Sequence, residues 1–165
     1  SIELVPVQKF INHWWISPPV DADPKGGIEF APAHEKIFTS AEFDPAKEKW
    51  KIAIEENGIF DLNKHVTTKA PIFGYLYTQV HSSFSHDILT KIGSDDGVRI
   101  WVNGEVAYTR EIHRPLKPDE DSILLKLKKG WNSILVKVRN NYGGYGFCMR
   151  FADPTGAVEL MKLAK

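Results

Sequence analysis

The sequence predicts an all-β fold in which antiparallel strands form a two-sheet β-sandwich. Short apolar runs recur about every 8 to 12 residues with turn residues between them, which is the spacing of sandwiches and barrels. The clearest turn is Asn103-Gly104, because both residue types tolerate the positive φ angles of a two-residue hairpin. Helical periodicity is thin, and prolines at 18, 19, 24 and 32 indicate an irregular crossing over residues 17–35.

The expected strands are apolar-rich runs bounded by turn residues: Trp50–Ile54, Gly74–Val80, Ile88–Ile92, Arg99–Val102, Val106–Thr109, Ile123–Leu127, Ser133–Arg139 and Phe147–Phe151. Glu29–Phe30 is a candidate short edge piece, and Ala157–Lys165 is a strand or a helical turn leading to a neighbour. No repeat or linker divides the chain, so residues 1–165 are expected to form one module. Because it opens at Ser1 without a signal peptide, we expect it to be a segment of a larger protein.

Composition excludes several partners. Lys plus Arg and Asp plus Glu both number 21, and a net charge of zero argues against nucleic acid, which demands a basic face. No apolar stretch approaches the roughly 20 residues that span a bilayer. Cys148 is the single cysteine, so no intramolecular disulfide can form. We expect it to pack as a small buried hydrophobe, since a nucleophilic role would need a base placed by the fold.

Strand direction predicts which loops meet. If successive strands alternate in direction, the chemically rich loops Ser94–Gly97, Arg110–Asp121 and Asn140–Gly146 gather at one end, together with the long connection Asn57–Pro71. The plain turns then lie at the other end: Ser82–His86, Asn103-Gly104 and Lys129–Asn132. Loops grouped at one end of a rigid sandwich usually carry its function.

The stretch Gly93-Ser94-Asp95-Asp96-Gly97 is the most informative. Two adjacent carboxylates in a tight turn can point toward one spot, which adjacent residues of a flat strand cannot. Such oxygen ligands suit Ca²⁺ or direct hydrogen bonds to sugar hydroxyls. The alternative is an ordinary turn, in which Asp caps its own backbone.

Two further loops offer ligand chemistry. Asn140 and Asn141 supply amides for vicinal hydroxyls, and Tyr142 and Tyr145 supply rings that stack on the apolar face of a pyranose. The alternative is a long hairpin loop whose tyrosines pack on the rim. In the loop before Asp121, His113 and Arg114 form a donor pair for a carboxylate-bearing sugar or a solvated charge, and the second reading is favoured.

The five tryptophans divide by position. Trp50, Trp101 and Trp131 lie in or beside alternating strands, so we expect all three to be buried. Adjacent strand residues face opposite sides, so at most one of Trp14 and Trp15 belongs to the core, and Trp15 is a candidate ligand contact. The histidines show no metal-binding spacing, and no nucleophile elbow or phosphate loop is present. The sequence therefore predicts no enzymatic activity for this chain.

A family resemblance rests on two runs. Residues 92–105, which contain the Ser-Asp-Asp-Gly turn, resemble the galactose-binding-like jelly roll of bacterial polysaccharide hydrolases and lyases. They also resemble the protective-antigen type lectin domain. Residues 128–138 look like a strand pair of the sugar-binding domain in β-galactosidase-like enzymes, and Trp15-Ile16-Ser17-Pro18-Pro19 is similar to the start of many such modules. The resemblance implies Asp95 and Asp96 as sugar or Ca²⁺ contacts, with Asn140 or Asn141 as a companion.

From this resemblance we expect a non-catalytic carbohydrate-binding module that targets a polysaccharide or oligosaccharide for an attached glycoside hydrolase or polysaccharide lyase. Its partners would be a carbohydrate ligand and a covalently attached catalytic domain, with no nucleic acid and no membrane span. The expected location is extracellular, periplasmic or at the cell surface. The alternative is a structural or protein-interaction sandwich that orients a neighbouring catalytic domain.

Overall fold

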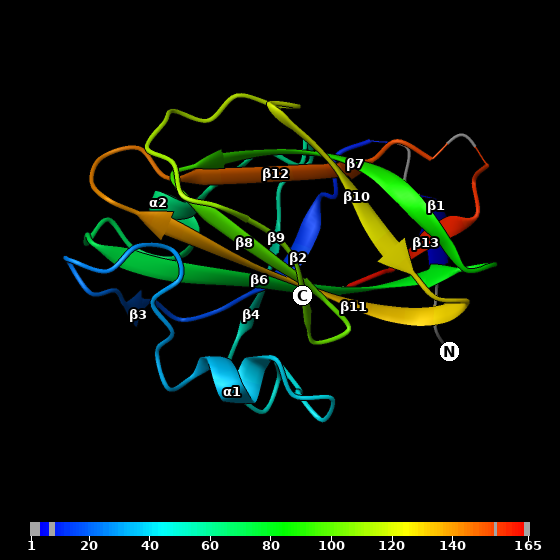
Figure 1. Cartoon of the computed structure of the whole chain (residues 1–165), viewed down its shortest axis with the longest axis horizontal. Helices are drawn as coiled ribbons and strands as arrows, with labels where there is room; N and C mark the ends of the chain where they lie inside the picture. The colour runs from blue at the N-terminus through cyan, green and yellow to red at the C-terminus, as the bar shows by residue number, and fades with distance from the viewer. Residues whose placement is uncertain (1–3, 7–8, 154, 164–165) are drawn as a thin grey trace.

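The chain folds into two antiparallel β-sheets packed face to face (Figure 1). The computed structural model describes residues 4–6, 9–153 and 155–163. Within these residues, helix is limited to two four-residue segments, α1 (Glu35–Phe38) and α2 (Leu62–His65). Neither is long or apolar enough to cross a bilayer. The predicted all-β, two-sheet sandwich is confirmed.

The large sheet has a main path of six strands, and three short strands lie beside it. Its main order is β1 (Leu4–Pro6), β13 (Val158–Met161), β6 (Ile72–Ser82), β11 (Gly130–Asn140), β8 (Val98–Val102) and β9 (Glu105–Arg110). The short strands are β2 (His13–Ile16), β3 (Val20–Asp21) and β4 (Lys51–Ile54). The small sheet has the order β10 (Asp121–Leu127), β7 (His86–Asp95), β12 (Gly146–Phe151) and β5 (Phe60–Asp61).

Every strand expected from the central part of the sequence forms, with its ends moved by a few residues. Asn103 and Gly104 adopt φ values of 52° and 80°, as the predicted hairpin requires. Glu29–Phe30 is a turn rather than an edge strand, and the strand in that crossing is β3. The C-terminal segment forms β13, while its last two residues lie outside the described part.

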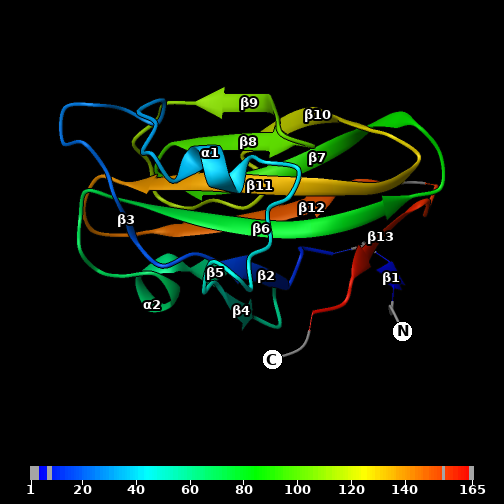
Figure 2. The ribbon, with the colours of Figure 1, turned by 90° about the horizontal axis from the view of Figure 1, so that it is seen from below.

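Apolar side chains fill both faces of the large sheet. Between the sheets, Ile134, Val136 and Val138 of β11 pack in one cluster with residues of β7 and β12. On the outer face, a second cluster joins Tyr75 of β6 to Phe38 and other residues of the segment 22–50, which crosses in front of the sheet in Figure 2. Where both faces are covered, from Ile72 to Thr78 and from Ile134 to Asn140, β6 and β11 are buried at every position instead of at alternate ones.

The outer face also holds a buried ion pair. Lys137 is fully buried, its ammonium pairs with Glu35, and it donates a hydrogen bond to the carbonyl of Phe30 at 2.5 Å. The hydroxyl of Tyr75 donates to the same Glu35 carboxylate at 2.7 Å. These contacts fasten α1 to the sheet.

Three sheet crossings lie at the same end of the sandwich, at the left of Figure 1. The chain passes from β7 to β8, from β9 to β10 and from β11 to β12, and each step moves it between the two sheets. A hydrogen bond from Asn63 Nδ2 to the carbonyl of Gly143 adds the connection after β5 to this group. The predicted meeting of the rich loops is therefore confirmed.

The loop 111–120 folds back over the outer face of the small sheet. A Cβ on Gly93 would lie 2.3 Å from the carbonyl oxygen of Lys117, so only glycine permits this approach. Cys148 is fully buried under the same loop, and burial raises the pKa of its thiol to about 11. It thus packs as the sequence predicted.

The tryptophan predictions hold with one exception. Trp14, Trp50 and Trp101 are buried, and Trp15 is half-buried. Trp131 is also only half-buried, so its predicted burial is wrong. It lies at the start of β11 on the outer face, beyond the part of the sheet that residues 22–50 cover.

Candidate functional site

The turn after β7 places two acidic residues where the chain crosses between the sheets. Asp96 is almost fully buried, and its carboxylate accepts hydrogen bonds from Arg114 N at 3.0 Å and Asn141 N at 2.8 Å. The amide of Asp96 donates to the carbonyl of Arg139 at 2.8 Å. The Asp95–Asp96 peptide bond is cis. One side chain therefore joins three loops that are distant in sequence.

Asp95 lies beside Asp96 and is 9% exposed. Burial, together with the hydrogen bond and negative charge of Asp96, raises the pKa of Asp95 to about 7, against the opposing charge of Arg114. A Cβ on Gly144 would lie 2.8 Å from Asp95 Oδ2, so glycine lets the third loop approach the carboxylate closely. Two neighbouring carboxylates in such a place favour a shared proton or a cation.

Asn140 follows Arg139, whose carbonyl accepts the hydrogen bond from Asp96 N, so its backbone lies beside the acidic turn. It is fully buried, and neither polar atom of its side chain has a hydrogen-bond partner among the described residues. Strand alternation directs it to the same face as Val138, which is the face between the sheets. The side chain of Asn141 is already engaged, because its Oδ1 accepts a hydrogen bond from Arg139 Nε at 2.7 Å.

This donor set fits Ca²⁺. Hard cations take carboxylate and amide oxygens, and a carboxylate that accepts one hydrogen bond per oxygen retains further lone pairs. No three His, Cys, Asp or Glu side chains cluster for a metal among the residues described, so an amide must complement the carboxylates. Asp95, Asp96 and Asn140 would hold the ion. When bound, Ca²⁺ would supply positive charge that orients ligand hydroxyls.

Two exposed rings border the acidic pair. Tyr142 is 69% exposed, and its ring makes an edge contact with the imidazole of His113 at a centroid distance of 4.9 Å. His113 Nε2 lies 3.8 Å from Asp96 Oδ1. An aromatic face next to oxygen ligands can stack on the apolar side of a sugar while the polar groups meet its hydroxyls.

The structure corrects three of the predicted contacts. Tyr145 is 4% exposed, and its hydroxyl donates to the carbonyl of Val138 at 2.7 Å, so the ring is part of the core. The guanidinium of Arg114 points inward and pairs with Asp121. Trp15 lies opposite Tyr77 in mid-sheet and packs on the outer-face cluster, away from the loops.

One residue at the site differs from its predicted role and another is new. The sequence pairs His113 with Arg114 as donors, but the fold turns only the imidazole toward the acidic pair. Asn63 of α2 reaches the third loop through Gly143, and its Oδ1 is buried with no hydrogen-bond partner in the described part of the chain. The one sequence feature that pointed to Asn63 is the alternation of strand direction, which places the connection 57–71 at this end of the sandwich.

No protein-family model and no curated protein sequence matches this chain significantly. Solved structures are similar in fold. An anti-sigma factor domain-containing protein superposes with a TM-score of 0.52 at 12% identity, over 92% of this chain and 45% of the other. A β-glucosidase from Kluyveromyces marxianus in complex with glucose gives a TM-score of 0.50 at 13% identity, over 86% of this chain and 16% of the other.

Two more distant likenesses are a family 35 carbohydrate-binding module from an environmental isolate and the PA14 domain of the antifreeze protein MpAFP. The first has a TM-score of 0.47 at 12% identity, over 60% of this chain and 78% of that one. The second has a TM-score of 0.45 at 14% identity, over 92% and 69%. The chain spans less than half of the two proteins that superpose best among these four. At these identities the comparisons establish the sandwich fold alone.

Proposed function

We propose that this chain is a non-catalytic carbohydrate-binding module whose site is formed by Asp95, Asp96, Asn140, Tyr142 and His113. The observation that carries the proposal is that two buried carboxylates and a buried amide without a hydrogen-bond partner among the described residues lie on hydrogen-bonded segments, with an exposed aromatic ring beside them. Native proteins pair most buried polar atoms, so a group left unpaired at a loop end suits a ligand or an ion.

In this proposal the module acts as an accessory to a larger glycan-processing protein, and its location is extracellular, periplasmic or at the cell surface. Support comes from proteins of the same fold, in which the matched region is one part of a longer chain, as in the β-glucosidase. A jelly roll of the galactose-binding type is the proposed ancestry. Ca²⁺ is the proposed ion, held by the two carboxylates and the Asn140 amide.

A glycan array of the isolated chain, with Ca²⁺ and with a chelator, tests this function. We expect binding to at least one glycan class and loss of most of it in the chelator. Tyr142→Ala should weaken binding roughly tenfold if stacking contributes about 1–2 kcal/mol. Asp95→Asn should weaken it more, because it removes an ion ligand.

Phe84→Ala is the matched control, since Phe84 is another exposed aromatic ring, 43% exposed, but lies at the opposite end. It should bind like the parent. If the parent binds no glycan, or if both loop variants bind like the parent, the proposal is wrong.

One observation favours the alternative function, a protein-interaction sandwich. Leu124 and Leu89 are neighbours across β10 and β7 on the outer face of the small sheet, and they are 64% and 39% exposed. Val106 of β9 is 52% exposed at the adjoining edge. Exposed apolar residues grouped in this way mark interaction surfaces in many proteins. If the chain binds no glycan on the array but binds a partner protein, and Leu124→Lys abolishes that protein binding, the interaction role is favoured.

A further inference from the structure

The outer face of the large sheet is covered over only part of its length. The segment 22–50 packs against Tyr75 and Lys137, which lie in the middle of β6 and β11. Beyond it, the outward residues are Gln79 of β6 and Ser133 and Trp131 of β11, all half-buried. Ser133 and Gln79 lie directly opposite each other, because they pair in the ladder between β11 and β6. This end is opposite to the one that carries Asp95.

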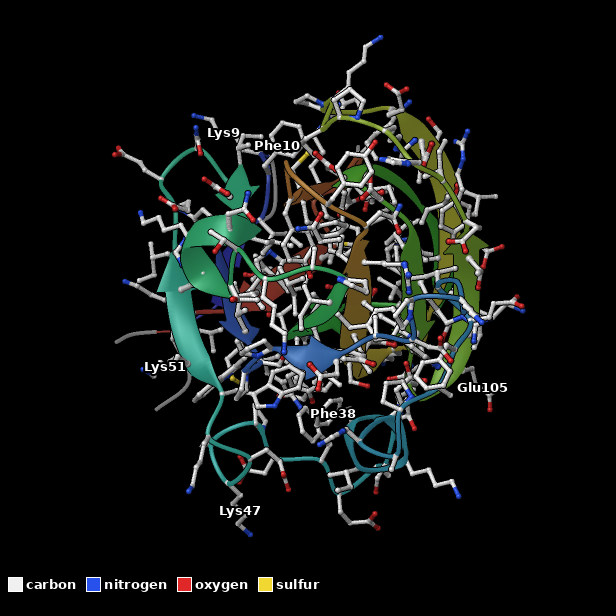
Figure 3. All side chains as sticks on the ribbon, turned by 90° about the vertical axis from the view of Figure 1, so that its left-hand side faces the viewer. Lys9, Phe10, Phe38, Lys47, Lys51 and Glu105 are labelled. Atoms are coloured by element: carbon white, nitrogen blue, oxygen red, sulfur yellow. The ribbon has the colours of Figure 1, made fainter. Side chains whose placement is uncertain are left out.

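A groove of about 500 Å³ lies between this bare part of the sheet and the edge of the covering segment. Phe38, labelled in Figure 3, lies between α1 and the sheet and forms one side of the groove, and Glu105, labelled at the β9 side, forms another. Its volume falls within the usual range for small-ligand sites, about 300–1,000 Å³.

Aromatic rings and polar groups line the groove together. The rings belong to Trp101, Trp131, Tyr77 and Phe43. The ring of Trp131 contacts that of His81 at a centroid distance of 5.3 Å, and Trp131 remains half-buried. A large indole left partly exposed beside other rings provides a stacking surface.

The polar side chains at the groove have hydrogen-bond donors and acceptors that are not paired within the described residues. Within the described residues, the side chains of Ser133, Glu105 and Lys128 form no hydrogen bond or ion pair with any other residue. Gln79 donates one bond, to Tyr77 at 3.2 Å, which leaves its carbonyl oxygen free. The carboxylate of Glu105 and the ammonium of Lys128 carry opposite charges, so the groove has no net charge from them. Such a lining selects for a neutral ligand with many hydroxyls.

We propose that this groove is a second carbohydrate site, which binds neutral sugar residues by stacking on Trp131 and hydrogen bonding to Gln79, Ser133 and Glu105. A sugar ring matches this lining because it presents an apolar face and hydroxyl edges at once. The second site does not depend on the loop site. β11 extends from Trp131 to Asn140, which is about 30 Å at 3.3 Å per residue, so one polysaccharide chain can engage both ends of the module.

The test uses the whole chain and ¹H–¹⁵N NMR spectra, with neutral hexasaccharides of cellulose, xylan, mannan, galactan and starch at millimolar concentrations. We expect at least one of them to shift the indole signal of Trp131 and the amide signals of Ser133 and Gln79. Trp131→Ala should weaken that binding roughly tenfold. Glu105→Gln, an exposed change that spares the fold, should weaken it severalfold.

Phe84→Ala is again the control, because Phe84 lies at the same end but outside the groove. Absence of groove shifts with every hexasaccharide overturns the second site, as does equal binding by Trp131→Ala and the parent. Tyr142→Ala separates the two proposals. If it abolishes all binding while Trp131→Ala has no effect, only the loop site exists. If the effects are reversed, the loop proposal fails and the groove stands.

Discussion

Arg114→Met removes a buried guanidinium that fastens the loop 111–120 to the small sheet. Arg114 is 8% exposed and donates to both carboxylate oxygens of Asp121 at 3.0 and 2.8 Å. It also donates to the carbonyl and the hydroxyl of Ser94 at 2.9 and 3.0 Å. Methionine keeps most of the apolar volume, so the loss is mainly electrostatic.

Removing one partner of a buried ion pair costs about 3–5 kcal/mol. Asp121 is 4% exposed but retains its pair with Arg110, so we expect the lower end, about 3 kcal/mol. Urea unfolding followed by tryptophan fluorescence at pH 7 measures it. Arg110→Met is the matched control, because Arg110 meets the same carboxylate with a side chain that is 43% exposed, and it should cost about 1 kcal/mol or less.

The pH dependence sharpens the test. Burial alone would raise the pKa of Asp121, but the hydrogen bonds and charge of Arg114, with the charge of Arg110, hold it below its usual 3.8. A depressed carboxyl pKa contributes stability above the unfolded value and loses it as pH falls through the folded value. The free energy of unfolding that Arg114→Met loses relative to the parent should therefore be largest at pH 7 and shrink below about pH 4.

Equal losses for the two arginine variants, or a deficit that does not change with pH, would refute this reasoning. A second outcome concerns ligands. Because the guanidinium of Arg114 faces inward, folded Arg114→Met should bind glycans like the parent. Lost binding with an intact fold would restore Arg114 as a ligand contact.

Three further predictions follow from buried polar groups. Tyr145→Phe should cost about 1–2 kcal/mol in urea unfolding, because the carbonyl of Val138 loses its partner, and should leave glycan binding unchanged. Lys137→Met should cost about 3 kcal/mol by stranding Glu35, and adding Glu35→Gln should recover part of it; no recovery would contradict the ion-pair account. The raised pKa of Asp95 means that the folded state keeps a proton which the unfolded chain loses, so in a chelator the unfolding free energy should fall between pH about 4 and about 7. Asp95→Asn should not show that fall, and parallel profiles would argue against the raised pKa.

The sequence by itself determined the strands and the end at which the loops meet. Alternating apolar residues and Asn103-Gly104 fix strands and turns through local geometry, and strand direction follows by counting. That count places Asp95, Asp96 and Asn140 at one end of the sandwich, because they lie at or just after the ends of β7 and β11.

Only the tertiary structure decided which side chains face the ligand and which face the core. Tyr142 and Tyr145 are three residues apart and chemically alike, yet one is 69% exposed and the other 4%. Their difference arises because the hydroxyl of Tyr145 meets a carbonyl of β11, a contact between different strands. Arg114 was drawn inward by Asp121 in the same way.

The exposed part of the outer face has the same origin. Trp101 and Trp131 both adjoin strands and read alike as core residues, but the covering segment ends before it reaches Trp131. The extent of that cover depends on where Phe38 and Glu35 pack across the sheet. Such contacts join residues far apart in the sequence, Phe38 to Tyr75 and Glu35 to Lys137, and local sequence patterns carry no information about them.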